Sequence, residues 1–185
     1  NNGDGTFRDL TTTVGLGDSD KNLRSSGCAW GDYDRDGFLD LIVVRHLKEL
    51  APDTLVSGDF YLAVGLLALY HANGDGTFSE VTEMLGDTRN REKNLYGEAI
   101  GSLWGAGFQP GWFDYDEDGY PDLYLANDFF GPDRLYHNQR NGTFAEVTRD
   151  ILPHVPWFSM GTDVADLNND GLFDLMSSDM AGSDH

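Results

Sequence analysis

The sequence has little positive charge and no long apolar run. Lys and Arg number 12 against 32 Asp and Glu, which gives a formal net charge of −20. Such a charge repels nucleic-acid phosphates and anionic lipid surfaces, so we expect no nucleic-acid partner. The longest nearly apolar run, Phe60 to Tyr70, is well short of the roughly 20 residues that span a bilayer. We therefore expect no membrane-spanning helix.

Cysteine and proline are also scarce. Cys28 is the single cysteine and has no partner for an internal disulfide. It lies in an apolar stretch beside Trp30, where we expect a buried and unreactive side chain. There are 23 glycines against 6 prolines, and many glycines follow Asp or Asn. This composition is typical of a chain that turns often, and it predicts an all-β fold.

One short motif predicts hairpins. Asn-Gly-Asp-Gly-Thr-Phe at residues 2–7 recurs within residues 69–78 and, shortened to Asn-Gly-Thr-Phe, within residues 135–144. In the two later copies Leu-Tyr-His precedes the turn, as expected for two short strands joined by an Asn/Gly turn. We predict two complete hairpins and, near the start of the chain, a lone outer strand over Thr6 to Thr12.

An acidic string of ten residues occurs three times, beginning at Asp32, Asp114 and Asp166. Each copy has a carboxylate or amide at positions 1, 3 and 5, Gly at position 6 and Asp at position 9. The glycine allows a sharp turn that brings the first three oxygens around a common centre. Two carboxylates about 4 Å apart repel by roughly 1 kcal/mol in water, and a hard divalent cation removes this repulsion. The alternative is a set of Asx-type turns without metal.

Calcium fits these loops better than other common ions. A flexible ring of carboxylates and carbonyls suits its high coordination number, magnesium tends to retain waters, and the loops lack the Cys or His that zinc prefers. Position 12 is not acidic and a strand-like run follows, so the loops are not EF-hands. We predict about three calcium ions, the third held more weakly because an Asn replaces a carboxylate. The predicted side-chain ligands are Asp32, Asp34, Asp36 and Asp40; Asp114, Asp116, Asp118 and Asp122; and Asp166, Asn168, Asp170 and Asp174.

The acidic strings resemble the FG-GAP repeats of integrin α-chain β-propellers, and more closely the VCBS-type FG-GAP repeats of the ASPIC/UnbV group of secreted proteins. The residues that carry the resemblance are Trp30 to Leu41, Trp112 to Leu123 and the two hairpins. It implies β-propeller blades with calcium in the loop between the first two strands of each blade. It also implies a protein outside the cytosol, which is extracellular, secreted or at the cell surface, or periplasmic.

We interpret residues 1–185 as a single FG-GAP/VCBS β-propeller segment with an incomplete ring. The expected parts are an outer strand of a preceding blade with a linker (1–23), a first blade (24–85), an insertion (86–106), a second blade (107–150) and a partial third blade (151–185). Two four-stranded blades and partial ones are too few to close a ring. We therefore expect either a longer propeller chain or copies that join end to end through open blade edges.

Two groups of aromatic residues have different expected roles. Those that recur with the repeat are expected in the core between blades, and they are Trp30, Trp112, Tyr70, Tyr136, Phe78 and Phe144. Those that do not recur, Trp104, Trp157 and Phe158, are candidates for a binding surface for a protein or glycan ligand.

The histidines are expected to pack rather than react, since His71 and His137 hold equivalent places in the repeat. No Ser or Cys nucleophile with a His base stands out, so we expect no enzyme. The predicted function is a calcium-binding extracellular module for binding, adhesion or structural assembly. The alternative is a propeller domain of a secreted hydrolase or lyase with its active site in the insertions or in other sequence.

Overall fold

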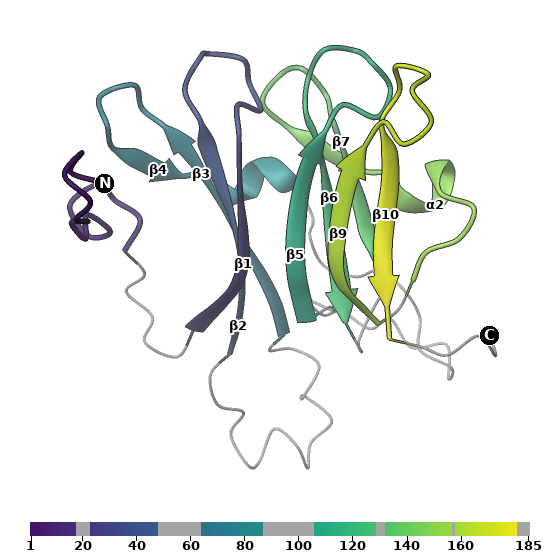
Figure 1. Ribbon diagram of the computed structural model, residues 1–185, viewed down its shortest axis with the longest axis horizontal. Coiled ribbons are helices and arrows are strands. Elements are labelled where there is room, and N and C mark those ends of the chain that lie inside the picture. Colours follow the sequence, from purple (N-terminus) through teal and green to yellow (C-terminus); the bar gives the residue numbers. More distant parts are fainter. Residues whose placement is uncertain (18–22, 48–63, 87–105, 129–131, 157, 181–185) are drawn as a thin grey trace, which may run out of the picture.

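The described residues form three antiparallel sheets that stand side by side (Figure 1). The computed structural model describes residues 1–17, 23–47, 64–86, 106–128, 132–156 and 158–180. The prediction of an all-β fold with incomplete propeller-like blades is confirmed. No helix in these ranges is long and apolar enough to cross a membrane.

Two sheets have four strands in chain order, and the third has two strands within the described residues. The first sheet contains β1 (Leu23–Gly31), β2 (Asp40–Leu47), β3 (Val64–Ala72) and β4 (Phe78–Glu80). The second contains β5 (Ala106–Phe113), β6 (Asp122–Asp128), β7 (Arg134–Asn138) and β8 (Phe144–Glu146). The third contains β9 (Ser159–Ala165) and β10 (Asp174–Asp179). Short helices η2 (Thr82–Leu85) and α2 (Thr148–Ile151) follow β4 and β8.

The same register recurs in the first strand pair of every sheet. The residue just before each acidic string pairs with the Asp at position 9, as Gly31 with Asp40, Phe113 with Asp122 and Ala165 with Asp174. Each acidic loop therefore joins two neighbouring antiparallel strands at the same end of its sheet. The sequence repeat is thus a structural repeat, and residues at equal distances from the loop are equivalent in the three units.

Side chains alternate between the two faces of each sheet, which we call face A and face B. Face A of the first sheet packs on face B of the second to form the largest core cluster. The first sheet contributes Ile42, Val44, Leu67 and Leu69, and the second contributes Trp112, Leu123, Leu125, Tyr136 and Phe144. Face A of the second sheet, with Phe113 and Tyr124, packs on face B of the third, with Val164 and Leu175. Consecutive units therefore stack with face A on face B.

Two sequence predictions about side chains on face B of the first sheet are wrong. Trp30 was expected in the core and is 52% exposed, and Cys28 was expected to be buried and is exposed. Both side chains lie on face B, on which no sheet among the described residues packs. Residues 10–17 shield another part of this face, where Leu16 contacts the cluster of Leu41 and Tyr70. Equivalent residues thus differ in burial because only the second and third units have a neighbouring sheet against face B.

The predicted outer strand over Thr6 to Thr12 is also wrong. Residues 6–10 have no regular structure and residues 11–15 form a turn. A strand needs hydrogen bonds from a neighbouring strand, and the backbone hydrogen bonds described for residues 6–12 lead only to Asn2, Val14 and Leu16. The segment is instead fixed to the first sheet by the amide of Phe78, which donates to the carbonyl oxygen of Val14 at 2.7 Å.

Candidate metal sites

Each acidic loop is closed by bonds from backbone amides to its own carboxylates. In the first loop the amides of Asp36 and Gly37 donate to the two oxygens of Asp32, at 3.0 and 3.1 Å. The turn needs two residues at positive φ, and these are Arg35 at 63° and Gly37 at 91°. Because glycine takes this conformation without strain, the Gly at position 6 fixes the loop.

The other two loops repeat this arrangement. Asp114 accepts from the amides of Asp118 and Gly119 at 3.0 and 2.8 Å. Asp166 accepts from the amides of Asp170 and Gly171 at 3.1 and 2.9 Å. The three predicted ligand sets thus occupy loops of one geometry.

The Asp at position 9 anchors the first two loops to the sheet. Asp40 has no exposed surface and accepts from the amides of Tyr33 at 3.1 Å and Ala72 at 2.9 Å. Asp122 is equally buried and accepts from Tyr115 at 3.1 Å and Asn138 at 2.7 Å. Each carboxylate therefore connects its loop to the third strand of the same sheet.

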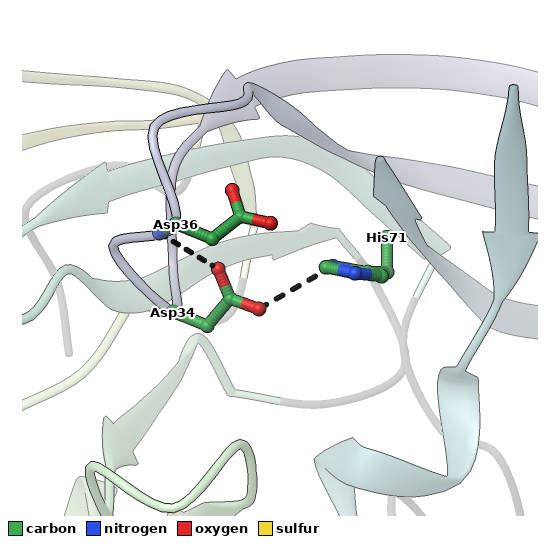
Figure 2. Close-up of side chains that lie close together, drawn as sticks. All are labelled: Asp34, Asp36 and His71. Carbon is green, nitrogen blue, oxygen red and sulfur yellow. Dashed lines mark hydrogen bonds and ion pairs between the residues drawn. The ribbon is translucent and has the colours of Figure 1, made fainter. Parts of the chain in front are cut away.

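A histidine lies against each of these two loops. Nδ1 of His71 is 3.2 Å from Oδ1 of Asp40 and 3.4 Å from Oδ2 of Asp34, and Figure 2 shows the ring facing Asp34 and Asp36. Nδ1 of His137 lies 3.2 Å from Asp122 and 3.7 Å from Asp116. The sequence analysis expected both histidines only to pack. Their recurrence after Leu-Tyr in both hairpins was the available signal.

Carboxylate and imidazole groups converge in the first two loops. Four sets of three such groups have ligand atoms within 4.8 Å of one another, and these are Asp32, Asp34 and Asp40; Asp34, Asp36 and His71; Asp114, Asp116 and Asp118; and Asp116, Asp122 and His137. The part of the chain that the structure describes shows no such set in the third loop, where Asn168 donates to Asp170 at 2.9 Å. Each of the eight predicted ligands of the first two loops thus belongs to one of these sets, with Asp36 and Asp122 in the sets that also contain a histidine, and no single set contains all four carboxylates of a loop.

The electrostatics of these loops favour a cation. Burial raises the pKa of Asp40 and that of Asp122, and the neighbouring carboxylates of Asp34 and Asp116 add to the rise. Hydrogen bonds from the backbone amides and the charges of the histidines lower the pKa of these two carboxyl groups. Oδ2 of Asp118 is buried without a hydrogen bond, with Nε of Arg140 at 3.3 Å. Crowded, partly desolvated carboxylate oxygens of this kind are suitable ligands for a hard divalent ion.

A second polar cluster, which the sequence analysis missed, joins the second and third sheets. Asp133 is fully buried and accepts from the hydroxyls of Tyr124 at 2.6 Å, Ser159 at 2.8 Å and Ser177 at 3.0 Å. It also accepts from the amide of Asn127 at 2.8 Å. Burial raises the pKa of Asp133. These residues do not recur in the repeat, so the sequence carries no signal that groups them.

Most of the other candidate residues lie outside the residues that the structure describes. Trp104, Trp157 and most of the predicted insertion at 86–106 lie outside the described residues. Phe158 is half-buried, and its carbonyl oxygen accepts from the amide of Met180 at 3.1 Å.

The comparisons with known proteins agree with the repeat. A family profile described as an FG-GAP-like repeat matches residues 1–43 and 114–177, which is more than half of the chain. No curated protein matches the chain.

Proposed function

Because the chain belongs to the FG-GAP-like repeat family, we propose that it is a calcium-binding β-propeller repeat module. About three ions bind, one in each acidic loop. The observation that carries the proposal is the convergence of carboxylate and imidazole groups within 4.8 Å in two loops of the same geometry.

The proposed ligands are the side chains predicted from the acidic strings. In the first loop the side chains of Asp32, Asp34 and Asp36 surround the ion, and Asp40 completes the set from the start of β2. His71 steadies the carboxylates of Asp34 and Asp40 by lying between them. The second loop works in the same way with His137. The third loop has an amide at position 3 and binds more weakly, since calcium affinity falls with the charge of the ligands.

Calcium binding supports an extracellular role in this proposal. Family membership and high acidity suit a secreted or cell-surface protein, or a periplasmic one. Three ions would reduce the net charge from −20 to about −14. The module then serves in binding, adhesion or structural assembly, with a protein or glycan as ligand.

Calorimetric titration of the calcium-free chain, with melting curves in calcium and in excess chelator, tests the proposal. We expect about three ions, and a clear fall of Tm in chelator because an ion that binds only the folded state stabilises it by mass action. Asp36→Ala and Asp118→Ala each lose about one ion. Asp75→Ala is the matched control, because Asp75 is an exposed turn carboxylate bonded to Thr77 and belongs to no acidic loop. An unchanged melting curve in excess chelator would refute calcium binding.

A further inference from the structure

One nitrogen of a buried arginine in the second unit has no hydrogen-bond partner. The side chain of Arg134, in the first position of β7, is 9% exposed. Within the described ranges, its Nη2 atom is buried and makes no hydrogen bond. Buried polar groups in proteins are almost always hydrogen-bonded, and a buried charge is costly unless it is paired. The guanidinium of Arg134 therefore lacks an acceptor that its burial requires.

The acidic residues near Arg134 do not supply this acceptor. Oε2 of Glu146 is 3.7 Å from Nη1 of Arg134, which is beyond hydrogen-bond distance. Oε1 of Glu146 accepts from the amide of Thr148 at 3.0 Å. The two oxygens of Asp133 accept from the amide of Asn127 and from the three hydroxyls of the polar cluster between the second and third sheets. Glu146 thus forms a long ion pair with Arg134, and Asp133 is engaged by other donors.

A cavity of about 100 Å³ lies beside Arg134. Part of its lining comes from Glu146 at the end of β8, from Thr148 and Arg149 in α2, and from Val155. One water molecule needs roughly 10–15 Å³, so the cavity has room for a group of several heavy atoms. It therefore offers two guanidinium groups, one from β7 and one from α2, to a single small ligand.

The first unit has the same framework without the two arginines. Ala68 and Glu83 hold the positions equivalent to Arg134 and Arg149, as the matching registers of the last strand pairs show. In both units the threonine after the fourth strand accepts a backbone amide of the third strand through its hydroxyl, at 3.2 and 2.8 Å. The four-stranded unit thus forms without either arginine, so the repeat fold alone does not account for these two charges.

We propose that this cavity, which we call the arginine cavity, binds a small carboxylate anion between Arg134 and Arg149. The parallel N–H groups of a guanidinium match the two oxygens of a carboxylate, and Nη2 of Arg134 gains the acceptor that it lacks. Arg149 adds a second positive charge from α2. A singly charged carboxylate is favoured over a dianion such as sulfate, because Asp133 and Glu146 also line the cavity and repel each added negative charge.

Titration of the chain with sodium acetate, followed by NMR at the arginine Nε–H signals, tests this site. We expect a saturable shift of the Arg134 signal that sodium chloride at the same ionic strength does not produce, and weaker binding of sulfate than of acetate. Arg149→Gln should weaken acetate binding several-fold. It keeps the fold because Arg149 is exposed, which circular dichroism verifies. Arg8→Gln is the matched control, because Arg8 is equally exposed and does not line the arginine cavity.

A pair of glutamine variants gives the sharper result. Glu146→Gln removes the carboxylate that competes for Arg134 and keeps the oxygen that accepts from Thr148, so acetate affinity should rise several-fold. Glu80→Gln changes the net charge equally at the equivalent position of the first unit, and it should leave acetate affinity unchanged.

Three results would overturn the proposal: an Arg134 signal that acetate does not shift, a shift that chloride reproduces, or sulfate binding as tight as that of acetate. Equal effects of the two glutamine variants would also contradict it, since they would show that net charge and not the arginine cavity sets the affinity. Neither Arg134 nor Arg149 belongs to an acidic loop, so this proposal and calcium binding can fail separately.

Discussion

The side-chain amide of Asn138 donates to the carbonyl oxygen of Tyr33 at 2.8 Å, across 105 positions of sequence. Tyr33 lies in the first acidic loop, and the backbone amide of Asn138 bonds Asp122 of the second. The same side chain also donates to Pro121 at 3.0 Å. One buried residue therefore links the two best-formed candidate metal sites through the contact between the sheets.

Replacing Asn138 with Ala should destabilise the fold by roughly 1–3 kcal/mol, because buried carbonyl oxygens lose their donor. Urea unfolding measures this loss. The exposed neighbour Gln139 provides the control, and Gln139→Ala should change stability by less than about 0.5 kcal/mol. Equal effects of the two substitutions would show that the link between the loops contributes nothing.

Asn168→Asp should strengthen calcium binding at the third loop by several-fold or more. The substitution supplies the missing carboxylate at position 3 and removes the amide that donates to Asp170. Asn169→Asp adds the same charge at position 4, where the other loops carry the exposed Arg35 and Glu117. Calcium titration should show a gain for the first variant and little change for the second. A similar gain in both would mean that overall charge, and not ligation, sets the affinity.

Gly31→Ala should cost roughly 1–3 kcal/mol of stability, as overpacking in a filled core does. Its Cβ would lie 2.6 Å from the Trp112 ring. The matched substitution is Gly111→Ala in the equivalent strand, whose Cβ would meet only Thr162 at an ordinary 3.6 Å. Thermal unfolding of both variants in calcium measures the difference, and the contact of Trp112 with the first sheet is unimportant if they melt alike.

The stability of the calcium-free chain should depend on pH through Asp133. Burial raises the folded-state pKa of Asp133 above its ordinary 3.8, so the folded protein holds this proton more tightly than the unfolded one. The stabilising contribution is complete below about pH 3.8 and is lost as pH rises through the folded-state pKa. Urea unfolding of wild type and Asp133→Asn in chelator from pH 4 to 7 isolates the effect. The stability of wild type relative to the variant should fall across this range, whereas parallel profiles would contradict the assignment.

The local parts of the structure were predictable from the sequence. The ten strands of the described residues and the three acidic loops depend on alternation, on Asn/Gly turns and on a Gly at a position of positive φ, and each of these leaves a pattern within about ten residues. FG-GAP family membership is confirmed by the profile match, whereas the closer resemblance to the ASPIC/UnbV group stays a prediction.

What could not be predicted depends on contacts between distant segments. Trp30 and Trp112 hold equivalent places in the repeat, yet Trp30 is exposed and Trp112 is half-buried because a neighbouring sheet packs against it. His71 meets Asp40 across 31 positions of sequence. Asp133 gathers hydroxyls from residues that no repeat relates. Sequence periodicity describes a unit but not what lies against it.

The third unit is held to the rest of the protein by little apolar surface. Val164 and Leu175 pack on the second sheet, the hydroxyls of Ser159 and Ser177 donate to Asp133, and every residue of β10 is exposed or half-buried. Segments with few buried apolar contacts open locally at a lower free energy than the whole domain. In native-state amide hydrogen exchange we therefore expect β9 and β10 to lose protection together, as a cooperative unit separate from β1–β8.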